Sequence, residues 1–297
     1  MKVQKNSKFE LTSETVVTWN GKTLYRIKAL KTFGAVSKGD VGGFVEALKN
    51  LDENGNAWVY GDAWVSDDAW VSDDARVSGD AWVSGNARVY GDAWVSGDAW
   101  VSDDAWVSDD AKVYGDARVS GDARVSGNAR VSGNARVSGD AKVYGDARVS
   151  GDARVSGNAW VYGDAWVSDD AWVSDDARVS GDAWVSGNAW VSDDAWVSGN
   201  AFSIPPLQIQ GSRHHVNVMS HSKIKIGCYE KTVAEWKKQF KAIGKENGYT
   251  VGQIKEYKLY IDLAEQWFET HKTALAQANK DAEIERAKED ENAIRTK

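Results

Sequence analysis

Several residue types that build common folds and sites are scarce in this chain. A single Cys among 297 residues excludes a disulfide framework and a Cys-rich zinc site, and four His leave little material for a His-built metal centre. No run of eighteen apolar residues occurs, so we expect no membrane span. The stretch Met1–Asn6 leads into polar sequence without the apolar segment of a secretory signal. These absences predict a soluble cytoplasmic protein that needs no cofactor and no metal.

The charge of the chain is acidic overall but uneven along its length. The net charge of −8 disfavours nucleic acid as a partner. Residues 61–110 contain twelve Asp and two Arg, residues 111–156 contain five Asp and eight Lys or Arg, and residues 157–200 contain eight Asp and one Arg. A basic middle segment therefore lies between two acidic segments.

Internal repetition dominates what is present. From Ala57 to Ala195 the motif Ala-x-Val recurs every six residues, twenty-four times without an insertion, as in Gly133–Ser138 (GNARVS). On a short strand, Ala and Val share one face and x takes the other. The x residues are mostly Trp, Arg or Lys, which are too large for a narrow interior, so Ala and Val should point inward. The Gly/Asp–Asp/Asn pair suits a corner with left-handed backbone.

This pattern, for example Val119–Arg124 (VSGDAR), resembles the hexapeptide repeat of left-handed parallel β-helix proteins. The resemblance implies that three hexads make one triangular coil of eighteen residues, so the repeats would form about eight left-handed coils. It extends to hexapeptide-repeat proteins of phages and gut bacteria that are similar to acyltransferases. We therefore predict a mainly β protein, a β-solenoid with an N-terminal β cap and a C-terminal β-plus-helix domain.

Domain boundaries follow from where the repeats begin and end. We expect an N-terminal β cap over residues 1–56 and the solenoid over 57–204. A C-terminal β and helical domain should follow over 205–271. Residues 272–297 are charged and poor in large apolar residues, which predicts a helical or disordered tail.

The ends of the chain carry their own structural signals. Asn20 and Gly21 lie between apolar runs and predict a β-hairpin. Thr232-Val-Ala-Glu has the form of a capping box, so a helix should begin there and stop at Gly244, and Thr250 should open a second helix. Alternating apolar residues predict short strands at Val216, Val218, Ile224 and Ile226.

Thirteen of the sixteen Trp occupy the outward x position. With eighteen residues per coil, the outward residues form three ladders that are aromatic near both ends and basic in the middle. The ladders are Trp58, Arg76, Trp94, Lys112, Arg130, Arg148, Trp166, Trp184 and Phe202; Trp64, Trp82, Trp100, Arg118, Arg136, Arg154, Trp172 and Trp190; and Trp70, Arg88, Trp106, Arg124, Lys142, Trp160, Arg178 and Trp196.

Two interpretations of these ladders stay open. Trp suits strands, ladder neighbours pack on one another, and duplication copies residues without selecting each one. Alternatively, so many outward Trp form an apolar patch larger than a monomer usually shows, which marks self-association, a protein partner or a planar ligand. We take the ladders as the predicted interaction site.

Doubled acidic residues recur at the predicted corners. Stacked carboxylates could hold Ca²⁺, but the spacing lacks the form of the known calcium-binding loops, and solvated turns explain the doublets equally well. The doublets are Asp67-Asp68, Asp73-Asp74, Asp103-Asp104, Asp109-Asp110, Asp169-Asp170, Asp175-Asp176 and Asp193-Asp194.

Signals for catalysis are few. The resemblance to left-handed β-helix proteins implies acyl transfer from acyl-CoA or acyl-carrier protein. The repeats contain neither the His base of those transferases nor an extruded loop. Near the C-terminus, His214, His215 and His221 lie close in sequence to Cys228, which allows a Cys–His nucleophile pair or a buried thiol that only fills space.

We therefore expect a non-catalytic scaffold or interaction protein, not an enzyme, of phage or prophage origin. It should self-associate, or bind a protein partner, through the Trp/Arg ladders, without a membrane. Two alternatives are a protein that sequesters a planar or anionic small molecule, such as a nucleotide, and a degenerate hexapeptide acyltransferase. An acidic rod that mimics nucleic acid is a third, against which the basic middle segment argues.

Overall fold

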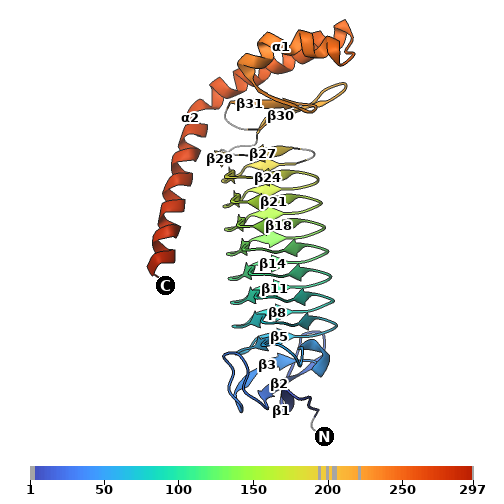
Figure 1. Ribbon diagram of the computed structural model, residues 1–297, viewed down its shortest axis with the longest axis vertical. Helices are drawn as coiled ribbons and strands as arrows, with labels where there is room; N and C mark the ends of the chain where they lie inside the picture. The colour runs from blue at the N-terminus through green and yellow to red at the C-terminus, as the bar shows by residue number, and fades with distance from the viewer. Residues whose placement is uncertain (1–3, 193–194, 199–200, 203–205, 220–221, 296–297) are drawn as a thin grey trace.

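Three sheets of short parallel strands wind into a three-sided β-solenoid that is capped at both ends (Figure 1). This computed structural model describes residues 4–192, 195–198, 201–202, 206–219 and 222–295. Each hexad supplies one strand, and strands eighteen residues apart pair in register, as Trp100 does with Trp82 and Arg118. The predicted coil of eighteen residues and the stack of about eight coils are confirmed.

We call the three sides of the solenoid faces A, B and C. Face A consists of β5 (Trp64–Val65), β8 (Trp82–Val83), β11 (Trp100–Val101), β14 (Arg118–Val119), β17 (Arg136–Val137), β20 (Arg154–Val155), β23 (Trp172–Val173) and β26 (Trp190–Val191). Face B consists of β4 (Trp58–Val59), β7 (Arg76–Val77), β10 (Trp94–Val95), β13 (Lys112–Val113), β16 (Arg130–Val131), β19 (Arg148–Val149), β22 (Trp166–Val167), β25 (Trp184–Val185) and β28 (Ala201–Phe202). Face C consists of β6 (Trp70–Val71), β9 (Arg88–Val89), β12 (Trp106–Val107), β15 (Arg124–Val125), β18 (Lys142–Gly145), β21 (Trp160–Gly163), β24 (Arg178–Ser180) and β27 (Trp196–Ser198).

The interior of the solenoid is a column of Ala and Val. All the repeat Ala and Val side chains point inward and are buried, for example Ala135 and Val137 with 0% exposure. Backbone hydrogen bonds join each coil to the next, as from Trp100 N–H to the Ala117 carbonyl at 2.9 Å. The small Ala and branched Val fill a triangular core too narrow for larger residues, so the inward orientation is confirmed.

The corners of the coils require left-handed backbone. Gly133 adopts φ +65°, and a Cβ there would lie 3.1 Å from the backbone nitrogen of Gly151 in the next coil. Asp occupies the same position in six units, for example Asp67 at φ +64° and Asp103 at φ +59°. Asp tolerates this conformation because its short carboxylate hydrogen-bonds locally.

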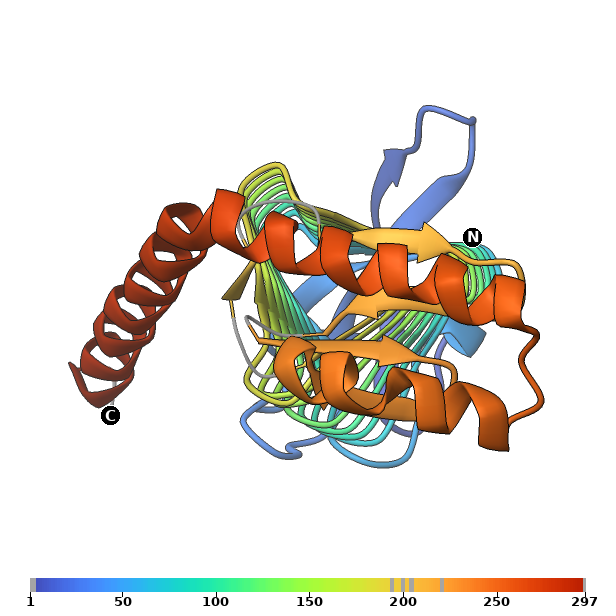
Figure 2. The same ribbon diagram turned by 90° about the horizontal axis from the view of Figure 1, so that it is seen from above.

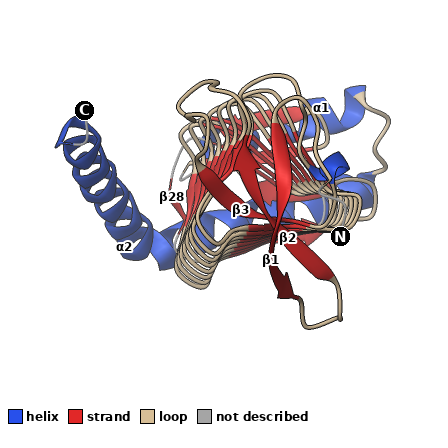
Figure 3. Cartoon of the chain, turned by 90° about the horizontal axis from the view of Figure 1, so that it is seen from below, coloured by secondary structure: helices blue, strands red, loops and turns tan. Residues whose placement is uncertain are grey.

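The N-terminal cap continues face A. The predicted hairpin is confirmed as β1 (Phe9–Val17) and β2 (Thr23–Ala29), which pair antiparallel. β2 pairs with β3 (Val41–Val45), and β3 pairs parallel with β5. A short 3₁₀ helix, η1 (Leu48–Asn50), follows. These strands cross the end of the coil stack, and the tip of the hairpin projects beyond it (Figure 3).

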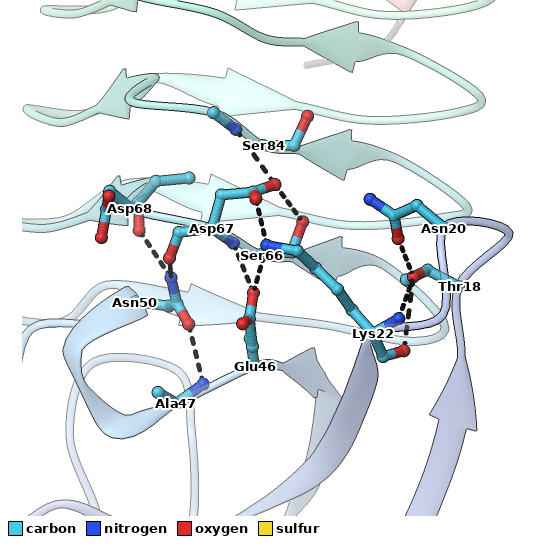
Figure 4. A network of polar contacts seen from close by, with 12 residues as sticks. Thr18, Asn20, Lys22, Glu46, Ala47, Asn50, Ser66, Asp67, Asp68 and Ser84 are labelled. Atoms are coloured by element: carbon cyan, nitrogen blue, oxygen red, sulfur yellow. Dashed lines mark hydrogen bonds and ion pairs between the residues drawn. The ribbon is translucent and has the colours of Figure 1, made fainter.

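A polar network fastens this cap to the first coils (Figure 4). Lys22 forms ion pairs with Asp67 and, at 3.2 Å, with Glu46, which also accepts a hydrogen bond from the Asp67 N–H at 2.7 Å. Partial burial alone would raise the pKa of Asp67, but hydrogen bonds from Lys22, Gly85 and Ser66 outweigh it and hold the pKa below its ordinary value. The hydrogen bond to Asp67 raises the pKa of Lys22.

The C-terminal cap is a small sheet covered by two helices (Figure 2). The antiparallel sheet contains β29 (Gln208–Gln210), β30 (His215–Val218), β31 (Lys223–Ile226) and β32 (Tyr229–Thr232). The helices are α1 (Val233–Glu246) and α2 (Val251–Arg295), and α2 continues through the boundary expected at residue 271. In the described part of the chain, no helix is long and apolar enough to cross a membrane.

Both predicted helix starts are confirmed, but one predicted stop is wrong. Thr232 and Glu235 form a reciprocal capping box at the start of α1. α1 runs on past Gly244 to Glu246, and Gly248, at φ +70°, takes the left-handed position after its end. Gly244 instead serves helix packing, because a Cβ there would lie 2.9 Å from the Ile254 side chain of α2.

Candidate functional site

Parallel pairing places the outward residues on the faces that the eighteen-residue period predicts. Trp64 pairs with Trp82 on face A, Trp94 with Lys112 on face B, and Trp106 with its neighbours on face C. The predicted site residues therefore form three continuous ladders, each confined to one face.

One rung of the face B ladder departs from the prediction. β28 pairs Ala201 with Trp184, and Phe202 with Val185. The prediction that Phe202 ends the outward ladder is therefore wrong, because the chain slips by one residue as it leaves the last coil.

Three of the predicted surface Trp are covered by the caps. Trp58 is 1% exposed and packs edge-on against Phe9 and Phe33 of the N-terminal cap, with ring centroids 6.3 and 5.4 Å away. Trp166 and Trp184 stack 5.0 Å apart and are also buried; α2 contacts β28 at this end of face B and descends beside it (Figure 1). These three residues are core residues of the cap junctions, so assigning them to an exposed interaction site was wrong.

Eight of the repeat indoles in the described part of the chain are anchored by a hydrogen bond to the coil that precedes them, whereas Trp64, Trp70, Trp106 and Trp160 have no Ser at the matching position. Trp82 Nε1–H donates to Ser66 Oγ at 3.1 Å, and Trp172 Nε1–H donates to Ser156 Oγ at 3.1 Å. Each Ser lies sixteen residues before its Trp, which is one coil less two residues. The same bond joins Trp94, Trp100, Trp166, Trp184, Trp190 and Trp196 to Ser78, Ser84, Ser150, Ser168, Ser174 and Ser180.

The sequence analysis did not predict this hydrogen bond, although the sequence shows Ser recurring sixteen residues before these Trp. Because the indole N–H is satisfied within the solenoid, it needs no ligand. The Trp ladders therefore have a structural role on every face, whatever else they do.

Face C satisfies its cations internally. Trp106 lies between Arg88 and Arg124, whose guanidinium carbons are 5.4 and 4.9 Å from the ring centroid. Trp160 lies in the same way between Lys142 at 4.6 Å and Arg178 at 5.2 Å. Interspersing Trp with basic residues thus gives four cation–π contacts on this face.

Face A orders similar residues in blocks. Trp82 and Trp100 stack 5.2 Å apart with an interplanar angle of 2°, and Trp172 and Trp190 stack at the same distance with an angle of 8°. Trp172 and Trp190 are 38% and 51% exposed, and neither cap covers them. Three consecutive rungs of Arg separate the two blocks of Trp.

The Arg block is the unsatisfied part of face A. Arg118 lies 5.8 Å from the Trp100 ring, but Arg136 and Arg154 make no ion pair, side-chain hydrogen bond or ring contact with any residue that the structure describes. Arg136 lies between Arg118 and Arg154 on paired strands about 4.8 Å apart, and like charges on paired strands repel. An anionic or aromatic partner would relieve this repulsion.

The stacked indoles leave little space for a planar ligand. Both ring faces of Trp82 are occupied, by Trp100 on one side and by Trp64, edge-on at 5.9 Å, on the other. Neighbouring Trp rings on the ladder already stack on one another, so a nucleotide-like ring is disfavoured from inserting between them. The geometry favours an extended surface laid against face A.

The doubled acids act as corner ligands of the backbone. The Asp67 and Asp103 carboxylates accept hydrogen bonds from the Gly85 and Gly121 N–H groups of the next coil, at 3.3 and 3.1 Å. The second Asp of a doublet accepts a hydrogen bond from the Asn side chain one coil earlier, as Asp104 does from Asn86 at 2.9 Å. Among the described residues no group of three His, Cys, Asp or Glu could hold a metal ion, and Asp193-Asp194 lie outside them.

His214 and Cys228 do not form a catalytic pair in the described part of the chain. Cys228 is exposed in the β31–β32 turn, and His214 makes no hydrogen bond with it. The His214 ring packs over Gly227, and the His214 N–H and carbonyl are held by the hydroxyl of Tyr257. His221 lies outside the described residues.

With this geometry in hand, comparison with known proteins shows similarity in the repeats and in the fold. The model of the YdcK β-solenoid repeat matches residues 69–85, 83–97, 111–127, 123–139, 129–145, 141–155, 147–163, 153–169 and 171–187, all within the solenoid. A search of curated proteins gives no match.

Two solved structures are similar in fold. One is a UDP-N-acetylglucosamine acyltransferase from Francisella novicida, at 12% identity and TM-score 0.28, covering 69% of this chain and 76% of that one. The other, from Bacillus cereus, is assigned as an acetyltransferase, at 15% identity and TM-score 0.22, covering 68% of this chain and 93% of that one.

The prediction that this chain is not an enzyme is therefore corrected. Of the two similar structures, one carries the name of an acyltransferase and the other is assigned as an acetyltransferase. The lack of His and of inserted loops in the repeats cannot by itself assign the protein to a non-enzymatic class, because fold and function vary independently. The expected phage origin stays a prediction that these comparisons do not test.

Proposed function

We propose that this protein is an interaction protein that self-associates side by side through face A. The observation that carries the proposal is the unsatisfied Arg block between two blocks of Trp. A second copy supplies aromatic partners for Arg118, Arg136 and Arg154.

The order of rungs on face A selects one antiparallel register. If the two-fold axis passes between the rungs of Trp100 and Arg118, then Arg118 faces Trp100 of the second copy, Arg136 faces its Trp82, and Arg154 faces its Trp64. A two-fold axis makes each of these contacts twice. A register centred on Arg136 would instead set Arg against Arg, which the repulsion of like charges disfavours.

The charge of the solenoid supports the same register. It places the basic segment 111–156, with eight Lys or Arg and five Asp, beside the acidic segment 61–110 of the second copy, with twelve Asp and two Arg. Charge complementarity of this kind orients two surfaces and suppresses wrong registers. In this register the six rungs from Trp64 to Arg154 of one copy face the same six rungs of the other copy in reverse order.

The oligomeric state tests the proposal. Light scattering should give a dimer for the wild-type protein. Arg136→Glu should weaken the dimer by roughly tenfold or more, because the new carboxylate would face the acidic segment 61–110 of the second copy. Trp106→Ser on face C is the matched control and should leave the dimer intact. A wild-type protein that is monomeric at every concentration overturns the proposal.

Cross-linking tests the register. In a Cys228→Ser background, which removes the only Cys, we would mix Trp100→Cys with Arg118→Cys and add a bismaleimide that spans the roughly 10 Å between packed sheets. This mixture should cross-link efficiently, whereas Arg136→Cys alone should not. Efficient cross-linking of Arg136→Cys alone would show that Arg faces Arg and that the register is wrong.

A further inference from the structure

The C-terminal cap contains a cavity that none of the solenoid arguments uses. It has a volume of about 440 Å³ and is lined by residues of strands β31 and β32 and of both helices. Ile226, Trp236, Tyr257 and Ile261, which line it, are nearly fully buried. Phe240 and Ile243 of α1 complete an apolar wall.

The cavity lies beside a close contact between the two helices. A Cβ at Gly244 of α1 would lie 2.9 Å from the Ile254 side chain of α2, and both residues line the cavity. Protein interiors are usually close-packed, so an open apolar volume of this size is a departure from ordinary core packing. Its size falls in the range of small-molecule sites, which are mostly apolar with a few polar groups at one end.

The polar end of the cavity is basic. His214 and Cys228, which line it, are exposed and mark the mouth. Arg213 reaches the same end: its guanidinium lies 4.8 Å over the ring of Tyr249, another lining residue, and donates to the Gly248 carbonyl at 3.0 Å. No carboxylate is among the described residues that line the cavity.

A second hollow of about 210 Å³ adjoins this mouth. It shares His214, Gly227 and Lys225 with the cavity and adds Arg213, and it too has no carboxylate among the described residues that line it. A ligand that enters the apolar cavity would therefore leave its head group beside cationic side chains.

We propose that this cavity binds an amphipathic monoanion, a medium-chain carboxylate, with its hydrocarbon chain among Ile226, Trp236 and Ile261 and its carboxylate at Arg213 and His214. Apolar burial supplies the affinity, and the cationic mouth selects the anion over a neutral or cationic head group. The site is independent of face A, so it stands or falls separately from self-association.

Calorimetry on the full-length protein tests the ligand class with decanoate, decan-1-ol and decyltrimethylammonium. Decanoate should bind with a stoichiometry of one, and the alcohol and the cation should bind roughly tenfold more weakly or not at all. Equal affinity for all three would overturn the assignment of an anion, and no binding of decanoate would overturn the site.

The single Cys reports where the probe binds. Because Cys228 lines the mouth, saturating decanoate should slow its reaction with iodoacetamide by roughly fivefold, as access falls. Binding measured by calorimetry without protection of Cys228 would place decanoate elsewhere and overturn the proposal.

Two variants separate the chain pocket from the head-group site. Ile243→Trp fills the cavity and should abolish binding of decanoate, whereas Leu259→Trp, at an exposed position of α2, should not. Arg213→Gln should weaken decanoate roughly three- to tenfold and leave the alcohol unchanged, and Arg76→Gln, at an exposed position of face B outside the proposed interface, is its control. Circular dichroism and melting temperature confirm that each variant folds; a folded Ile243→Trp protein that still binds decanoate contradicts the proposal.

Discussion

Faces A and C of the solenoid have the same backbone but differ in the order of their outward residues. Face C intersperses Trp with Arg and Lys, with never more than two basic residues in a row, so Trp106 and Trp160 each lie between two cations. Face A collects Arg118, Arg136 and Arg154 into one block, and the last two have no partner among the described residues. Because composition and strand geometry are so similar, the difference shows that rung order decides whether a face is satisfied by itself or requires a second surface.

The buried Val residues under faces A and C should contribute equally to stability. Substituting either one gives the largest loss of unfolding free energy that we expect. Val137 under face A and Val125 under face C are both fully buried. Val137→Asp and Val125→Asp should each cost more than about 4 kcal/mol of unfolding free energy, because each buries an unpaired charge. Urea titration would measure the loss.

The outward neighbour of Val137 is the control for this comparison. Arg136→Asp changes charge at an exposed position and should alter stability by less than about 1 kcal/mol. If Arg136→Asp unfolds the protein as Val137→Asp does, then the alternation of inward and outward side chains does not control stability in the way the structure implies.

Separating the three Arg of face A by Trp should give each Arg an aromatic neighbour, as the basic residues of face C already have. The double variant Trp82→Arg/Arg136→Trp gives face A an alternating order from Trp64 to Trp172. New cation–π contacts should raise the unfolding free energy by about 1 kcal/mol, and the new indole can donate to Ser120, sixteen residues earlier. Self-association should be lost, because no Arg block remains.

Light scattering and urea titration on this double variant test both parts. Composition and net charge are unchanged, so the wild-type protein is its own control. A variant that associates as strongly as the wild type would show that the content of Trp and Arg, rather than its order, drives assembly.

The sequence predicts the solenoid well because its structure is local and repeated. The hexad spacing predicts inward Ala63 and Val65 and the pairing of Trp64 with Trp82, and all three are confirmed. Each unit sees the same neighbours, so one correct unit predicts the rest.

Contacts between distant segments lie beyond such reasoning. Nothing in the repeat indicates that Phe9 and Phe33 cover Trp58, or that Trp184 is buried. The cavity of the C-terminal cap likewise depends on how α1 and α2 pack around Gly244, which the helix signals do not specify. The capping boxes predict where these helices begin, but not how they pack.

The hydrogen bond between indole and Ser sharpens the comparison within face A. Ser84 Oγ accepts from Trp100 Nε1–H at 3.3 Å, whereas the residue sixteen positions after Ser120 is Arg136, which has no indole. Ser84→Ala should therefore cost about 1 kcal/mol and Ser120→Ala close to nothing. Thermal unfolding of the two variants would measure the difference; equal losses would mean that the Ser position stabilises the coil through something other than the indole.

The smallest effect concerns the end of face A, where Lys22 and Asp67 join the cap to the first coils (Figure 4). The folded-state pKa of Asp67 is held below its ordinary value, so its ion pair contributes stability that is present above the unfolded-state pKa and is lost as pH falls through the folded-state pKa. Asp67→Asn keeps a residue that tolerates left-handed backbone, removes this contribution, and should lower stability at neutral pH by less than about 1 kcal/mol. It should also reduce the loss of stability between pH 5 and pH 3, roughly the range in which carboxylates titrate. Asp98→Asn, at a corner far from Lys22, controls for net charge, and an identical change in the pH profile of both variants would show that the cap junction is not the origin of the effect.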